Sequence, residues 1–222
     1  MYRVEDKFCC SEDELYCLQK RVGCVLRSDS NESSIEGYSI SSLYFDDYKD
    51  SCLLDTVEGN NARRKYRIRI YNHCLDVIKL EVKEKVDNRI FKRSRRINKE
   101  ELQMLMDGKC IENNSSVDDP VTLFNMAIQT AGLRPKVIVT YERKAFVYEP
   151  GNVRITLDRN VRKSDRVFQF GKSDMVYDFL KEDDSVLEVK YDEFMPQFIL
   201  QLLALGNMQQ TAYSKYQLCR ES

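Results

Sequence analysis

The chain has 222 residues, enough for one large domain or two small ones, and no stretch of linker composition divides it. Charged residues make up 32% of the chain, yet 35 Lys and Arg against 36 Asp and Glu give a net charge of -1. A protein that coats nucleic acid is usually more basic, so cations can matter here only where they cluster locally. We predict a single domain over residues 1–222 that does not bind nucleic acid.

The cysteines and the hydropathy exclude other classes. The chain has 8 cysteines but no C-x-x-C pair, and His73 is its one histidine, so a Cys/His zinc site is not expected. There is no signal peptide and no apolar run of membrane-spanning length. We therefore expect a soluble protein of a reducing, cytoplasmic compartment. Any membrane association would come through a separate membrane protein.

The first third of the chain alternates between strand and helix signals. Residues 2–8 alternate, with Glu5 and Lys7 on one face and Phe8 on the other. Ser11 opens a helix, because Glu14 three residues later completes a capping box. Residues 28–37 are polar and predict a loop, and residues 38–46 predict a strand that a second loop joins to the next one.

Residues 62–71 read Ala-Arg-Arg-Lys-Tyr-Arg-Ile-Arg-Ile-Tyr. With a period of two, Lys65, Arg67 and Arg69 share one face, and the apolar residues share the other. Neighbours on one face lie about 7 Å apart, so each such pair of cations repels by roughly 2 kcal/mol at an effective dielectric near 20. The strand predicted at residues 76–85 repeats the pattern, with Glu81 and Lys83 on its charged face. A bound polyanion would relieve this repulsion.

The remaining elements follow the same two periods. Residues 89–96 predict a basic strand whose facing is ambiguous. Further strands are predicted at residues 136–147, 153–161 and 186–192. Helices are predicted at residues 98–108, 120–132, 174–180, 196–205 and 207–219. On the later strands Arg154, Glu188 and Lys190 again oppose apolar residues.

These patterns predict eight strands, each with one apolar face that must be buried. We expect an α+β fold in which the strands form a closed eight-stranded antiparallel β-barrel with the amphipathic helices packed outside. The charged faces would then line the interior, and eight strands enclose room for side chains or one slim ligand. Such an interior would be a tunnel for a chain of phosphates.

Several segments, taken in order, carry a family resemblance. The first are the start Arg3-Val4-Glu5-Asp6-Lys7-Phe8, then Leu43-Tyr44-Phe45-Asp46-Asp47 and Lys65-Tyr66-Arg67-Ile68-Arg69-Ile70-Tyr71. The others lie at residues 78–83 (IKLEVK), 141–146 (YERKAF), 154–158 (RITLD), 186–190 (VLEVK) and 214–216 (SKY). Together these segments resemble the catalytic domain of the vacuolar transporter chaperone (VTC) polyphosphate polymerases, within the CYTH-like triphosphate tunnel metalloenzyme superfamily. The resemblance covers nearly the whole chain.

The resemblance implies a transferase that binds a nucleoside triphosphate, ATP, through its phosphates and passes the terminal phosphoryl group to growing polyphosphate. The residues it implies for phosphate binding and catalysis are Lys7, Arg67, Arg69, Lys83, Arg143, Arg154, Lys190 and Lys215. The resemblance implies that Glu188 holds a catalytic Mn²⁺ or Mg²⁺. Glu5 and Glu81, with Asp158, are further candidates for this metal.

The chemistry fits these residue types. Phosphoryl transfer needs positioning and neutralisation of charge more than covalent work by the protein. Arginine binds phosphate bidentately, lysine acts as a point charge, and one or two carboxylates suffice for Mg²⁺.

Three alternative functions stay open. The chain could be a polyphosphate or nucleotide binding module without turnover. It could also hydrolyse triphosphates, although Arg3 stands where hydrolytic relatives have Glu. RNA binding is the weakest, because aromatic residues do not interleave with the cations.

Overall fold

A computed structural model describes residues 4–29, 32, 34, 36–87, 89–112, 116–178, 180, 185–205 and 208–222. Arg3 therefore lies outside the described residues. The chain forms two compact units. Unit 1 contains Met1–Ser39, Tyr141–Val161 and Leu180–Ser214, and unit 2 contains Ile40–Thr140, Arg162–Phe179 and Lys215–Ser222. The family resemblance predicts one domain over the same residues, and that prediction is untested.

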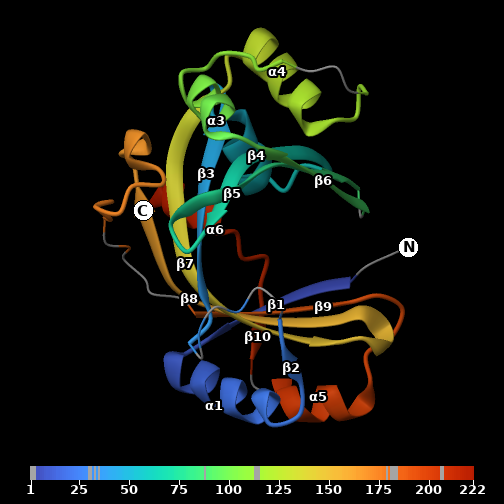
Figure 1. The fold of residues 1–222 in the computed structure, drawn as a ribbon. Coiled ribbons are helices and arrows are strands. Elements are labelled where there is room, and N and C mark those ends of the chain that lie inside the picture. The colour runs from blue at the N-terminus through green and yellow to red at the C-terminus, as the bar shows by residue number, and fades with distance from the viewer. Residues whose placement is uncertain are drawn as a thin grey trace. The chain divides into compact units, whose positions relative to one another are not determined.

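Unit 1 is a twisted antiparallel sheet with two helices on one face (Figure 1). Its strands are β1 (Val4–Cys10), β9 (Ser185–Tyr191), β8 (Val153–Ser164) and β7 (Arg134–Tyr148), with the short β10 (Gln209–Gln210) on β1 and β2 (Arg27–Ser28) on β7. The start of β7 and the end of β8 belong to unit 2. Helices α1 (Glu12–Gly23) and α5 (Gln197–Leu203) lie side by side. The predicted capping box of Ser11 and Glu14 starts α1.

The core of unit 1 fixes which face of each strand is apolar. Phe8, Ile155 and Leu187 from three strands pack with Leu18 of α1 and Ile199 of α5. Residues of the opposite parity therefore lie on the sheet face that the helices do not cover. This confirms the predicted alternation in β1, β8 and β9.

Unit 2 repeats this arrangement with other elements. β3 (Tyr38–Asp46), β4 (Ala62–Tyr71), β5 (Cys74–Val86) and β6 (Arg89–Ile97) pair in this order, and β3 begins in unit 1. Helices α3 (Lys99–Met106) and α4 (Pro120–Ala131) cover one face (Figure 1). Two more helices, α2 (Ser51–Val57) and α6 (Lys215–Glu221), contact each other. Phe124 of α4 meets Phe45 and Tyr66 edge to face, so aromatic contacts join α4 to the sheet.

The predicted closed eight-stranded barrel is wrong in strand number and in closure, although the α+β class and antiparallel pairing are confirmed. Ten strands form one ladder, in the order β10-β1-β9-β8-β7-β3-β4-β5-β6 with β2 on β7, and within the described residues it does not close. The two added strands, β2 and β10, have two residues each and no alternation to detect. β10 also occupies the outer edge of β1, at Phe8 and Cys9. Strand parity predicts which face a residue takes but not whether two edges meet.

Other differences concern short elements. Helix α2 replaces a predicted loop, because Asp46 and Asp47 accept hydrogen bonds from the backbone N–H groups that open it. The predicted helix at residues 174–180 is wrong for residues 174–178, where Asp178 bridges to Lys163 instead. Helix α6 begins later than predicted because Gln209 and Gln210 join the sheet. None of the helices in the described part of the chain is long and apolar enough to cross a bilayer.

Candidate functional site

The face of unit 2 opposite helices α3 and α4 gathers cations from three neighbouring strands. We call this the cation face. Register places nine cations on it, Arg63, Lys65, Arg67, Arg69, Lys79, Lys83, Lys85, Lys92 and Arg96. Glu81 is the one carboxylate on this face among the described residues of β4, β5 and β6. Nine positive charges and one negative charge leave eight positive charges in excess.

Glu81 is the centre of this face. Its Oε2 lies 2.7 Å from Nη2 of Arg67 and 4.0 Å from Nη1 of Arg69, and its Oε1 lies 2.6 Å from Nζ of Lys92. The residue is 1% exposed. Burial opposes ionisation of the Glu81 carboxyl, but the three cations outweigh it and hold its pKa well below the usual value. Glu81 therefore stays charged and holds Arg67 and Arg69 in place.

Two residues of β3 complete the support of these arginines. Arg67 donates from Nη1 to the Tyr44 hydroxyl at 3.1 Å, and its guanidinium lies 5.9 Å from the Tyr44 ring centre. Arg69 donates from Nε to Ser42 Oγ at 3.3 Å. Tyr44 also stacks on Tyr216, so its ring packs within unit 2 while its hydroxyl supports Arg67.

Three lysines lie directly opposite one another across the cation face. Lys65 on β4 pairs in register with Lys83 on β5, and Lys83 pairs with Lys92 on β6. Side chains at such positions have Cβ atoms about 5 Å apart, so like charges there repel. The sequence left the facing of Lys92 ambiguous, because only Ile97 anchors β6 to the core. Lys215 begins α6 in the same unit.

The face of unit 1 opposite helices α1 and α5 carries both signs of charge, and we call it the mixed face. Its charged residues on β1, β9, β8 and β7 are Glu5, Lys7, Glu188, Lys190, Arg154, Asp158 and Arg143. Four cations and three carboxylates leave one positive charge in excess. The predicted site residues of unit 1 are thus gathered on one face, as strand parity predicts.

A chain of ion pairs runs across the mixed face. Lys190 Nζ lies 2.7 Å from Glu188 Oε1 and 3.4 Å from Glu5 Oε2. Arg143 Nη2 lies 3.5 Å from Glu188 Oε2. Lys7 Nζ lies 3.4 Å from Glu5 Oε1 and donates to the Tyr213 carbonyl at 2.9 Å. An ammonium group therefore lies between the two carboxylates Glu5 and Glu188.

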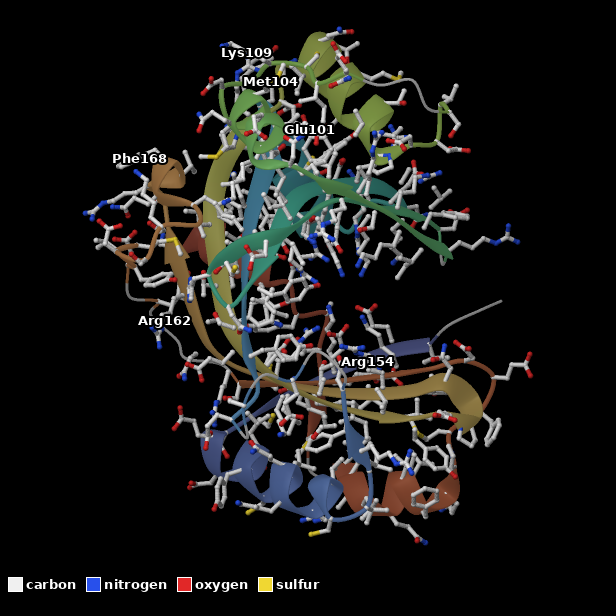
Figure 2. The ribbon with its side chains drawn as sticks, in the orientation of Figure 1. Glu101, Met104, Lys109, Arg154, Arg162 and Phe168 are labelled. Carbon is white, nitrogen blue, oxygen red and sulfur yellow. The ribbon has the colours of Figure 1, made fainter. Side chains whose placement is uncertain are left out.

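Two arginines of the mixed face are fixed by carboxylates. Arg143 makes a bidentate contact with the buried Asp158, at 2.6 and 2.7 Å. Burial opposes the Arg143 charge, but Asp158 outweighs it and raises the pKa of the guanidinium. Figure 2 shows Arg154 on the sheet face away from α1 and α5. Arg154 contacts Asp29, to which Tyr38 donates a hydrogen bond at 3.3 Å.

The carboxylates of the mixed face fit a divalent metal. Mg²⁺ and Mn²⁺ need few protein ligands when phosphate and water complete the shell, so Glu5 and Glu188 suffice as a donor pair. No group of three or more His, Cys, Asp or Glu side chains suited to a metal occurs among the described residues. Glu81, the third metal candidate from the sequence, lies in unit 2 with both oxygens in ion pairs, and its metal role stays a prediction.

Acid titration tests the electrostatic role of Glu81. Because its pKa is lowered on folding, its stabilising effect is complete above about pH 4.3, the usual Glu pKa, and is lost as the pH falls below that value. We expect Glu81→Gln to destabilise the protein at pH 7 by about 3–5 kcal/mol, as for other broken buried pairs. Urea unfolding between pH 7 and pH 3 should show a shallower acid decline for Glu81→Gln than for the wild type. Parallel declines would show that Glu81 does not stabilise through its charge.

Comparison with known proteins identifies the family and the fold of the chain. A family model described as the VTC domain matches residues 2–222. Two solved structures, each named a "putative adenylate cyclase", share the fold. The protein from Bacillus halodurans has a TM-score of 0.58 at 13% identity, with 96% of each chain covered. The one from Vibrio parahaemolyticus has a TM-score of 0.52 at 15% identity, covering 98% of this chain and 97% of its own. No curated protein matches the sequence. The family match confirms the resemblance seen in the sequence: the chain belongs to the VTC domain family.

Proposed function

We propose that the chain binds the phosphates of a nucleoside triphosphate and of polyphosphate and transfers the terminal phosphoryl group to the growing polymer. The observation that carries this proposal is the segregation of charge. The whole chain has a net charge of -1, yet the cation face alone has nine cations and one carboxylate. Such a surface binds a polyanion best, because the negative charges of the polyanion reduce the repulsion among the cations of the sheet.

The two faces suggest different contributions. On the cation face, Arg67, Arg69 and Lys83 bind phosphate oxygens, with Lys92 as an added ligand, and Lys215 binds from α6. On the mixed face, Arg143, Arg154, Lys7 and Lys190 supply positive charge beside Glu5 and Glu188. These two carboxylates would hold Mn²⁺ or Mg²⁺, which stabilises negative charge on phosphoryl oxygens when bound. No general base is required, because a polyphosphate acceptor oxygen is already anionic.

A second candidate is a polyphosphate or nucleotide binding module without turnover. The observation that favours it is the contact of Glu188 with Lys190 at 2.7 Å and with Arg143 at 3.5 Å. In this arrangement Glu188 neutralises the charge of Lys190 and Arg143, as the carboxylate of an ordinary structural ion pair does. Phosphate binding would then be retained while chemistry is absent, so the two candidates differ in turnover and not in affinity.

Paired arginine variants test phosphate binding. Arg67→Ala and Arg154→Ala should each weaken tripolyphosphate binding by about 1.5–3 kcal/mol, the range for a lost charge-assisted hydrogen bond. Calorimetric titration at low ionic strength measures this, and wild-type affinity should fall as salt is added. Arg64→Ala and Arg159→Ala are matched controls. They lie on the same strands, β4 and β8, on the helix-covered faces, and each is also paired with a carboxylate.

The controls should bind like the wild type. A wild type that does not bind tripolyphosphate at all would overturn the proposal. Equal losses in Arg67→Ala and Arg64→Ala would show that binding depends on net charge and not on the cation face.

Glu188→Gln separates the enzyme from the binding module. It keeps the shape of the side chain and removes its charge, so it should reduce formation of polyphosphate from ATP with Mn²⁺ or Mg²⁺ by about a hundredfold or more. Tripolyphosphate binding in the presence of a chelator should stay equal or tighten, because a negative charge leaves the mixed face. Products are resolved on a gel, and Glu142→Gln on the other face of β7 is the control.

Full metal-dependent turnover by Glu188→Gln would exclude Glu188 as a metal ligand. A wild type that binds polyphosphate but turns over no nucleotide with either metal would establish the binding module.

A further inference from the structure

The carboxylate of Asp46, at the end of β3, is the shared acceptor of a buried hydrogen-bond network in unit 2. Asp46 is 0% exposed. It accepts hydrogen bonds from the backbone N–H groups of Asp47 and Cys52 at 2.9 Å and of Leu53 at 3.1 Å. Two of these donors open helix α2. The carboxylate therefore cannot move without freeing the start of that helix.

Tyr216 of helix α6 is the fourth donor to Asp46, through its hydroxyl at 2.6 Å. The residue is 2% exposed, and its ring stacks on Tyr44, with ring centres 4.8 Å apart and an interplanar angle of 24°. Burial and the Asp46 contact raise the pKa of the Tyr216 phenol, so it remains a proton donor. Arg220 donates to the same hydroxyl at 3.1 Å and contacts Asp50 at 2.9 Å.

Helix α6 depends on these contacts for its place. It has seven residues, and an isolated helix of this length is unstable in water. Tyr216 and Cys219 are its buried residues. The hydrogen bond to Asp46 and the ion pair of Arg220 with Asp50 fix the helix to the end of β3 and to the N-cap of α2, and thereby fix the backbone from which Lys215 extends.

Tyr216 is also linked to Arg67, through Tyr44. Tyr44, on which Tyr216 stacks, accepts a hydrogen bond from Arg67 at 3.1 Å. Tyr216 is thus next to Lys215 in sequence and one contact removed from Arg67. We infer that Tyr216, held by Asp46, is a positioning residue that sets Lys215 and Arg67 for phosphate binding. This inference rests on the proposed function and adds two residues, Tyr216 and Asp46, that contact no phosphate themselves.

Tyr216→Phe removes the hydrogen bond to Asp46 and keeps the ring on Tyr44. We expect tripolyphosphate to bind this variant about tenfold more weakly, the scale of one lost hydrogen bond to a charged group. Calorimetric titration measures the affinity, and urea unfolding shows that the variant is folded. Tyr48→Phe, at a tyrosine of unit 2 that is 77% exposed, is the matched control and should bind like the wild type.

Double mutants separate positioning from general loosening of the fold. If Tyr216 acts through its neighbours, Tyr216→Phe should cause little or no further loss of tripolyphosphate affinity when Lys215→Gln or Arg67→Ala is already present. Its effect on urea stability should persist in both. If Tyr216→Phe does not fold, Arg220→Gln loosens the same helix at a less buried residue and should weaken binding by about threefold.

The outcomes are distinguishable. A wild type without affinity for tripolyphosphate overturns the proposed function and this inference together. A binding wild type with Tyr216→Phe of equal affinity overturns the inference alone. So does an affinity loss that is undiminished in both double mutants, because it would arise independently of Lys215 and Arg67.

Discussion

Repulsion among the cations of β4, β5 and β6 is the constraint on which unit 2 depends. Lys65, Lys83 and Lys92 lie in one cross-strand row, and Glu81, the one carboxylate on this face among the described residues of these strands, contacts Lys92 at the end of the row. A sheet with this charge is stable only because its other face is strongly apolar. Ile68 and Leu80 on that face, and Phe124 of α4 in the same core, are each 0% exposed. Burial of an aliphatic or aromatic side chain contributes about 1.5–3 kcal/mol, so several such residues offset the repulsion.

Several cations of both units are held in ion pairs. Glu81 contacts Arg67 and Lys92, while Asp158 fixes Arg143. Such pairs keep guanidinium groups ordered, which reduces the entropy that a phosphate must overcome on binding. They also compete with the phosphate for the same donors. Affinity should therefore reflect an exchange of partners and not the sum of all cations present.

The two faces differ in what they could supply to chemistry. The cation face has an excess of eight positive charges, which favours binding of a polyanion and offers little else. The mixed face has nearly balanced charge, and the ammonium of Lys190 lies between Glu5 and Glu188. A position that already holds one cation between two carboxylates is one where a divalent ion could replace it. This difference is why the proposed metal site is placed on the mixed face.

The facing of most site residues was predictable from sequence, because β4, β5, β8 and β9 each alternate apolar and charged residues. The sequence did not predict the side of Lys92, since β6 has one buried anchor and takes its facing from its register with β5. Nor did it predict the support of Arg154 by Asp29 and Tyr38, which are 125 and 116 residues away. The network of Asp46 and Tyr216 spans 170 residues. Contacts between such distant residues leave no periodic pattern in the sequence. The closure of a sheet leaves none either.

We propose that phosphates bind the charged sheet faces that the helices leave uncovered. The side-chain Nε–Hε resonances of the arginines in ¹⁵N-labelled protein test it most directly, because each arginine reports its own hydrogen-bond partner. On addition of tripolyphosphate, the resonances of Arg67 and Arg154 should shift, while those of Arg64 and Arg159 on the opposite faces of the same strands should stay unchanged. Shifts confined to Arg64 and Arg159, or equal in all four arginines, would contradict it.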